Sequence, residues 1–208
     1  MTTVQFNLKT GDLFFDGPAI WNVLDTFPNN VRAKSIDGLT RCFHYDEIRG
    51  CLILECPKDY EALDLRDISQ ETAAWLAQNS GLNGHVLQKV YDRVVQGWPC
   101  TSAYEYLGLN PGTPKHIRQI ISKMGEDCAF QVAQNHALDK QESETLARHP
   151  NASVRRALAR NVSVLNRNPA VVQRLKEDAD EAVLRAVEQT MRDAFVARHL
   201  HSHNHPSD

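Results

Sequence analysis

Apolar and polar residues recur in one order three times in the C-terminal half of the chain. The three segments are IISKMGEDCAFQVAQN (residues 120–135), LARHPNASVRRALARN (146–161) and LKEDADEAVLRAVEQT (175–190). The first two are offset by 26 residues and the last two by 29. Self-similarity at such a period is typical of repeat proteins, in which each unit buries its apolar face only against its neighbours. The pattern therefore predicts an α-solenoid.

Helix-start signals recur at about half the repeat period, which indicates two short helices per unit. They are Thr113-Pro114, Asp139, Asn151 and Asn168-Pro169, residues that favour the cap and first turn of a helix. Within the repeats, apolar residues four positions apart share one side of a helix. These pairs are Cys128 and Val132, Val154 and Leu158, and Val183 and Val187. We expect them to form one continuous core.

Helical patterns also precede the three repeats. The segment AAWLAQN ends at Asn79 and is similar to the endings of the later repeats. An apolar stripe, which ends at Gly97, consists of Val86, Leu87, Val90 and Val94. We expect a helix pair from about residue 69, as a weaker fourth copy of the repeat. Residues 97–113, which are rich in glycine and proline, are predicted to form an irregular insertion.

The N-terminal quarter has strand patterns instead. Val4, Phe6 and Leu8 alternate with polar residues, and apolar residues resume over 13–15 after Thr10-Gly11, so a hairpin is predicted.

A short helix is predicted over residues 18–27. Pro18 follows Asp16-Gly17, which is typical of a helix start. The residues that fall on one helical face are Ile20, Val23, Leu24 and Phe27.

Strands are predicted again between Val31 and Cys56, with turns at Asp37-Gly38 and over 46–50. The predicted fold class is therefore α+β: a small N-terminal α+β domain followed by a C-terminal α-solenoid of helix-pair repeats. The expected boundaries are 1–60 for the first domain, 61–198 for the solenoid and 199–208 for a histidine-rich tail.

The middle repeat resembles a known family. Its leading Leu-Ala, its His-Pro-Asn turn, its Val-Arg pair and its closing Ala-x-Asn are similar to the leucine-rich repeat variant unit, a relative of HEAT-like repeats. The resemblance covers about residues 117–190. It implies a curved all-helical stack, found mainly in bacteria and without a common activity. The first segment has Cys128-Ala129 in place of Val-Arg, and the third has Val183-Leu184 and ends in Thr190.

Composition favours a soluble cytoplasmic protein. No segment approaches the roughly 18 consecutive apolar residues that a membrane span needs, and the N-terminus lacks the pattern of a secretory signal. The five cysteines are an odd number, which favours free thiols in a reducing compartment. The net charge of -3 is unevenly distributed, since residues 1–71 carry 7 basic and 12 acidic side chains, whereas 144–208 carry 10 and 8.

Two groups of residues have side chains of metal-binding types. Cys42, His44, Cys51 and Cys56 have spacings unlike those of structural zinc sites, so buried or half-buried thiols are the favoured interpretation. The weak metal candidates are His199, His201, His203 and His205, for which a solvated tail is the favoured interpretation. We expect no cofactor.

Arginines of the repeats are the candidate contacts to a partner. They are Arg148, Arg155, Arg156, Arg160, Arg167 and Arg174. Arginine suits carboxylates and phosphates, but interleaved acidic residues are also typical of a salt-bridged exterior. The sequence thus favours a non-enzymatic adaptor or regulator that binds a protein through one face of the stack. The alternative is an arginine-lined face that binds a nucleic-acid phosphate backbone. No phosphate-binding loop or nucleophile motif supports an enzyme.

Overall fold

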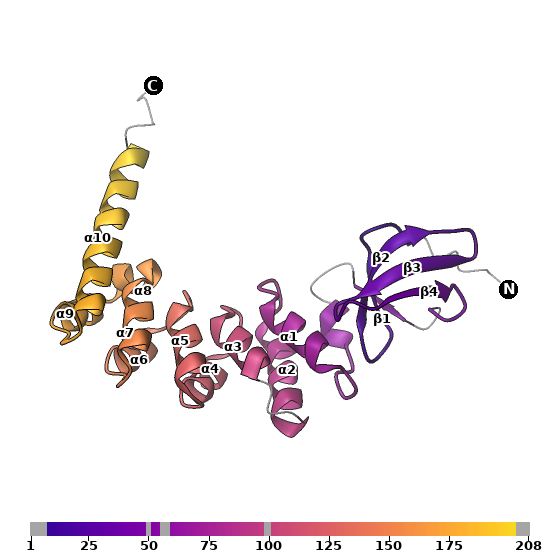
Figure 1. Ribbon diagram of the computed structural model, residues 1–208, viewed down its shortest axis with the longest axis horizontal. Coiled ribbons are helices and arrows are strands. Elements are labelled where there is room, and N and C mark those ends of the chain that lie inside the picture. Colours follow the sequence, from indigo (N-terminus) through magenta and orange to yellow (C-terminus); the bar gives the residue numbers. More distant parts are fainter. Residues whose placement is uncertain (1–7, 49–50, 55–58, 98–100, 203–208) are drawn as a thin grey trace. The chain divides into compact units, whose positions relative to one another are not determined.

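The computed structural model describes residues 8–48, 51–54, 59–97 and 101–202 (Figure 1). The chain is α+β, with an antiparallel sheet in its N-terminal part and helices after it, as the sequence predicted at this level. It divides into two compact units, 1–104 and 105–208. The junction predicted near residue 60 lies inside the first unit, where strands give way to helices.

The sheet of the first unit contains five described strands in the order β4-β3-β2-β1-β5. Their bounds are Leu13–Phe15 (β1), Ile20–Thr26 (β2), Asn30–Ser35 (β3), Thr40–His44 (β4) and Leu52–Ile53 (β5). Phe14 lies opposite Trp21 on the neighbouring strand. The ring of Phe43 packs edge-on against both, with centroid distances of 5.3 and 4.6 Å. This aromatic cluster forms the centre of the sheet's core.

The helix predicted over 18–27 is wrong, because these residues form strand β2. Ile20, Trp21 and Val23 are buried while Asn22 between them is exposed, and β2 pairs with β1 on one side and β3 on the other. The apolar spacing in this segment also fits one face of a helix, so pairing with distant strands decided the conformation.

The hairpin of β3 and β4 confirms the turn predicted at Asp37-Gly38. Gly38 has a φ of 96°, a left-handed conformation that glycine adopts without a Cβ clash. The strand predicted from Val4 to Leu8 lies almost entirely outside the described residues, as does Cys56.

Two helices and a short 3₁₀ turn complete the described chain up to residue 97. They are η1 (Asp59–Ala62), α1 (Gln70–Gln78) and α2 (Gly84–Gly97). Ser69 caps α1 by accepting a hydrogen bond from the Thr72 amide, and Asn79 ends the helix. The predicted apolar stripe of α2 is buried along its whole length. Both helices confirm the sequence interpretation.

The irregular insertion predicted over 97–113 is wrong, since it contains helix α3 (Thr101–Leu109). Ala103 and Leu107 on this helix are completely buried. Apart from Gly108, the glycine and proline residues of this segment lie outside α3. They mark helix ends rather than a loop.

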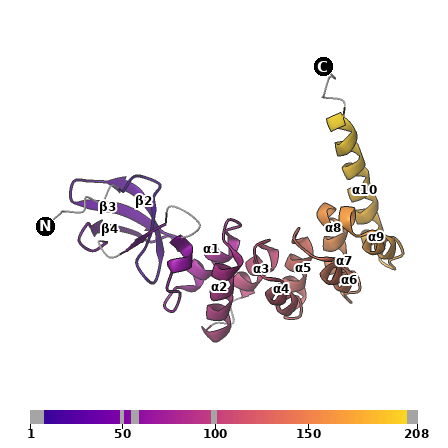
Figure 2. The same cartoon turned by 180° about the vertical axis from the view of Figure 1, so that it is seen from behind.

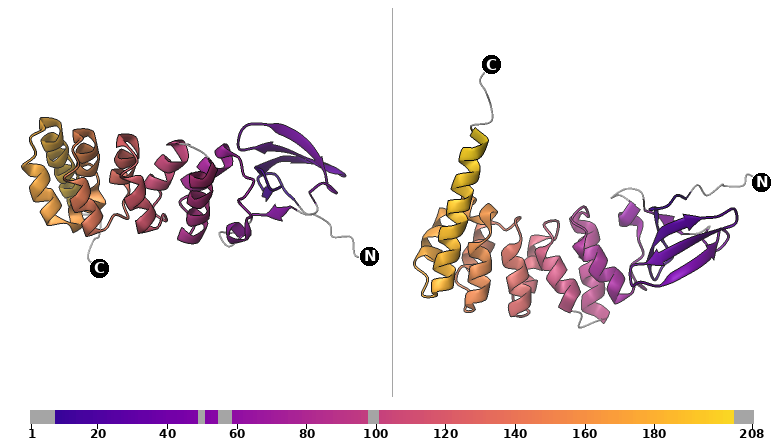
Figure 3. Two further views of the ribbon diagram at one scale, coloured as in Figure 1. Left: turned by 90° about the horizontal axis from the view of Figure 1, so that it is seen from below. Right: turned by 45° about the horizontal axis from the view of Figure 1, so that its top comes forward.

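After α3, the described part of the second unit consists of helices joined by loops. Their bounds are Lys115–Ile121 (α4), Glu126–Gln134 (α5), Lys140–Leu146 (α6), Ala152–Ala159 (α7), Val162–Arg167 (α8), Pro169–Lys176 (α9) and Glu181–Ser202 (α10). Helix α7 packs between α5 and α10 (Figure 1). Helix α10 has 22 residues against 8 in α7, and it extends well beyond the other helices of this unit (Figures 2 and 3).

The helix starts predicted at Asp139, Asn151 and Asn168-Pro169 are confirmed as caps of α6, α7 and α9. Helix α8 lies between Asn161 and Asn168, a connection that is three residues longer than the one from Asn135 to Asp139. This short helix therefore accounts for the change of offset from 26 to 29.

The predicted core of the repeats is confirmed, because its members are all buried. Their exposed fractions are 7% for Cys128, 1% for Val132, and 0% for Val154, Leu158, Val183 and Val187. Neighbouring helices therefore share one apolar interior, as the i and i+4 spacing predicted.

A buried asparagine side chain joins each of two helix ends to the one before it. The Asn135 side-chain amide donates to the carbonyls of Gly108 and Asn110, both at 2.9 Å. One repeat later, the Asn161 amide donates to the carbonyls of Ala133 and Asn135 at 3.0 and 2.9 Å. The side-chain oxygens accept backbone amides that follow each helix, those of Ala137 and Val164. The asparagines thus add a donor to buried carbonyls at helix ends, of which those of Asn110 and Asn135 also accept backbone amides.

We predict that Asn161→Ala lowers the free energy of unfolding by about 2–4 kcal/mol, because two buried carbonyls and the Val164 amide lose a partner. Urea denaturation followed by circular dichroism measures this change. The control is Ser153→Ala on the exposed side of α7, which should change stability by less than about 0.5 kcal/mol. Equal effects of the two substitutions would contradict the bridging role.

Candidate partner-binding face

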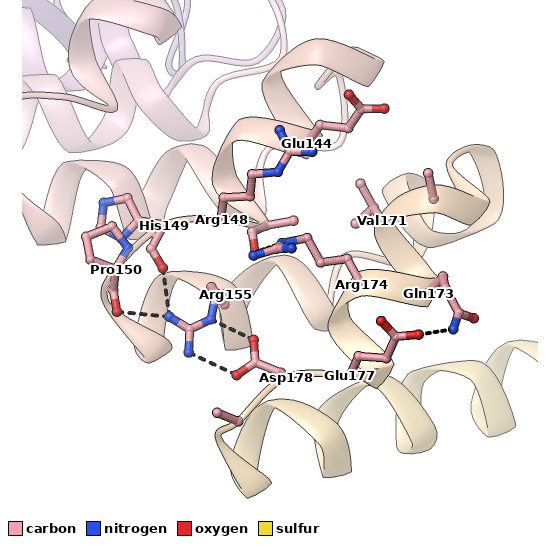
Figure 4. Close-up of a pocket in the computed structure, with 13 residues that line it drawn as sticks. Glu144, Arg148, His149, Pro150, Arg155, Val171, Gln173, Arg174, Glu177 and Asp178 are labelled. Carbon is pink, nitrogen blue, oxygen red and sulfur yellow. Dashed lines mark hydrogen bonds and ion pairs between the residues drawn. The ribbon is translucent and has the colours of Figure 1, made fainter.

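The structure separates the six candidate arginines into different environments. Arg148, Arg155 and Arg174 line a cavity of about 740 Å³ beside α9 (Figure 4). Arg156 and Arg160 line a different groove, between α7 and α10. Residues that are close in sequence therefore do not share one surface.

Arg155 is bound within the protein. Its Nε and Nη2 atoms contact the two carboxylate oxygens of Asp178 at 2.7 and 2.9 Å. Its Nη1 atom donates to the carbonyls of His149 and Pro150 at 2.7 and 2.9 Å (Figure 4). The exposed side-chain fractions are 16% for Arg155 and 7% for Asp178. This guanidinium therefore holds the loop before α7 to the loop before α10 with four hydrogen bonds.

Arg174 and Arg167 also donate to backbone carbonyls of earlier elements. Arg174 Nε lies 3.3 Å from the Ala147 carbonyl. Arg167 Nη2 lies 2.6 Å from the His136 carbonyl, and its Nε donates to Ser163 at 2.8 Å. Both side chains satisfy carbonyls near helix ends. Both contacts connect a helix of the second unit to an earlier part of the chain.

Sequence reasoning missed a second buried ion pair, between α4 and α6. Arg118 on α4 contacts both carboxylate oxygens of Glu142 on α6, with distances of 3.0 and 2.9 Å. The two side chains are only 7% and 3% exposed. Glu142 also accepts the Asp139 amide and completes the capping box of α6. The Asp-x-x-Glu spacing was the available signal for the capping box, whereas nothing local indicated the ion pair.

The groove between α7 and α10, called the α7/α10 groove below, has a volume of about 560 Å³. Its lining residues are Arg156, Arg160, Ala182, Arg185, Ala186, Gln189, Thr190 and Asp193. Among the described residues, the guanidinium groups of Arg156 and Arg160 have no hydrogen bond or ion pair. Arg156 lies on α7 and Arg160, four positions later, is its C-cap residue, so both project from one side of that helix.

Among the six candidate arginines, Arg148 is the third whose side chain has no polar partner in the described part of the chain. It is exposed and lines the cavity beside α9, which shares no lining residue with the α7/α10 groove. Three acidic side chains share that cavity with three arginines: Glu144, Glu177 and Asp178. The formal charges of these groups balance, so this cavity has no marked preference for an anion.

Cys42 and His44 lie on strand β4, where both are exposed, and Cys51 is half-buried. Within the described ranges, no group of three or more histidine, cysteine or acidic side chains is arranged to hold a metal ion. His199 and His201 belong to α10, which continues four residues past the predicted domain end at 198. His203 and His205 lie outside the described residues.

Comparisons of the chain with protein-family models, curated proteins and solved structures find no match. Among the described residues, no helix combines the length and apolar character needed to cross a bilayer.

The Arg155 ion pair predicts a component of acid sensitivity. The side-chain hydrogen bonds from Arg155 lower the pKa of Asp178, so the folded state favours the carboxylate more than the unfolded state does. The stabilisation is complete above the ordinary aspartate pKa of about 3.9 and is lost as pH falls through the lower folded value. At pH 7, Asp178→Asn should lower the free energy of unfolding by about 1–3 kcal/mol.

Urea denaturation between pH 7 and pH 2.5 measures this component. The stability of Asp178→Asn should approach that of the wild type as the pH decreases. The exposed control Glu188→Gln should follow the wild-type curve throughout. A constant difference between Asp178→Asn and the wild type across this range would show that the carboxylate charge does not stabilise the fold.

Proposed function

We propose that this chain is a non-enzymatic protein-interaction module, an adaptor or regulator. Its helical second unit would be a short solenoid of HEAT-like helix pairs that binds a partner through the face formed by α5, α7 and α10. The recurring asparagine bridges and the packing of α7 between α5 and α10 support a repeat architecture. So does the resemblance of residues 146–161 to the leucine-rich repeat variant unit.

One observation carries the proposal: adjacent arginines on α7 have different uses. Arg155 donates hydrogen bonds to Asp178 and two carbonyls, whereas the guanidinium groups of Arg156 and Arg160 donate none among the described residues. These two arginines therefore make no polar contact that would stabilise the fold, although both line a groove beside a packed helix. Such residues are suited to bind a partner, and arginine is among the residue types enriched at interfaces.

The alternative ligand is a nucleic-acid backbone, which the same arginines could contact. Residues 105–208 carry 14 basic and 13 acidic side chains, whereas dedicated nucleic-acid-binding domains usually carry a clear basic excess. This balance favours the protein partner.

Affinity purification of the tagged full-length chain from its native host tests the proposal. We expect co-purifying proteins to be lost from the double variant Arg156→Glu/Arg160→Glu, because the partner's contacts with both cations are replaced by repulsion. Quantitative mass spectrometry of the captured proteins is the measurement.

The matched control is Arg148→Glu, which reverses an arginine that also has no polar partner among the described residues but lines the cavity beside α9 instead of the α7/α10 groove. It should capture the same proteins as the wild type. If both variants capture the wild-type set, or if Arg148→Glu alone loses it, the proposed face is wrong.

A further inference from the structure

The residues that line the α7/α10 groove indicate which class of ligand it binds, an inference that rests on the proposed function. Its sides consist of arginines from two helices, Arg156 and Arg160 on α7 and Arg185 on α10. Between them lie the small side chains of Ala182 and Ala186. A side chain of a ligand can therefore approach the helix surfaces closely while its polar ends meet guanidinium groups.

The charges of the groove are unbalanced, unlike those of the cavity beside α9. Asp193 is the one acidic residue in its lining, and it accepts a hydrogen bond from Gln189 at 2.7 Å. Arg185 contacts Glu181 at 3.0 Å, but both side chains are at least 70% exposed. An ion pair between such exposed groups is weak, so Arg185 remains available to an anionic ligand. Three cations and one anion thus line the groove.

Helix α10 extends beyond the part of it that lines the groove. Thr190 occupies the position in its repeat that Asn161 occupies at the end of α7, and α10 continues beyond this point to Ser202. Val196 lies seven residues after Gln189, on the same side of α10 as the groove. Its side chain is 48% exposed. An apolar contact is therefore available next to the cationic part of the groove.

We propose that the α7/α10 groove binds an acidic peptide segment of the partner protein. Its carboxylates would pair with Arg156, Arg160 and Arg185, and an apolar side chain further along the peptide would pack against Val196. A carboxylate accepts two parallel hydrogen bonds from one guanidinium, which makes the contact directional as well as charged. The carboxylate of Asp193 and the near-neutral charge of residues 105–208 disfavour a continuous phosphate backbone.

Selection from a phage-displayed library of random twelve-residue peptides on the immobilised full-length chain tests this inference. Sequencing should show an excess of Asp and Glu in the peptides enriched by the wild type and by Arg148→Glu. The excess should disappear with Arg156→Glu/Arg160→Glu. The milder Arg156→Gln/Arg160→Gln variant and thermal melts of every variant separate loss of binding from loss of folding.

The most enriched peptide, labelled with fluorescein, then gives affinities by anisotropy. We expect the charge-reversed variant to bind it at least about tenfold more weakly, since charge-assisted hydrogen bonds are lost, and Arg148→Glu to bind it like the wild type. An enriched set without acidic excess, or an excess that survives the charge reversal, would overturn the inference.

Two comparisons distinguish this inference from the proposed function. If capture of host proteins depends on Arg156 and Arg160 while the selected peptides show no acidic excess, the proposed function stands and the acidic ligand is wrong. If a labelled twenty-nucleotide DNA binds more tightly than the peptide and is released by the same variants, the groove binds nucleic acid. That result overturns both proposals.

Discussion

The structure of the second unit depends on buried asparagine side chains that link two of its described helix ends to the preceding ones. Asn135 and Asn161 each donate two hydrogen bonds to carbonyls of the preceding repeat and accept one from the chain that follows. A short helix leaves its last carbonyls unpaired, and burial makes unpaired carbonyls costly. The asparagines donate to carbonyls at helix ends and set the distance between neighbouring helix pairs. Apolar residues four positions apart can then pack into one interior.

Two ion pairs also join parts of the second unit that are distant in sequence. Arg118 with Glu142 and Arg155 with Asp178 join helices or loops that are 24 and 23 residues apart in sequence. Removal of one partner would leave a charge in a mostly buried site, which is strongly destabilising. These arginines therefore belong to the stack itself. Arg156 and Arg160 have no such role, and this distinction directs the functional proposal to the α7/α10 groove.

The sequence predicted the helical part better than the sheet. Caps such as Asp139 and Asn151 act within one turn, so their residue types alone locate helix starts. The segment of β2 has apolar spacing that fits either a helix or a strand, and its partners β1 and β3 decided between them. The same limit applies to the candidate site. Arg155 and Arg156 are neighbours of one type, and only the position of Asp178, fixed by packing, shows that one is bound and the other is not.

The central claim is that adjacent arginines on α7 divide between stability and binding, and the free energies of unfolding of Arg155→Ala and Arg156→Ala test it most directly. Arg155→Ala should lose about 2–3 kcal/mol, because Asp178 and two carbonyls lose their donor. Arg156→Ala should change stability by less than about 0.5 kcal/mol. Equal losses in the two variants would contradict the account, because Arg156 would then also be part of the framework.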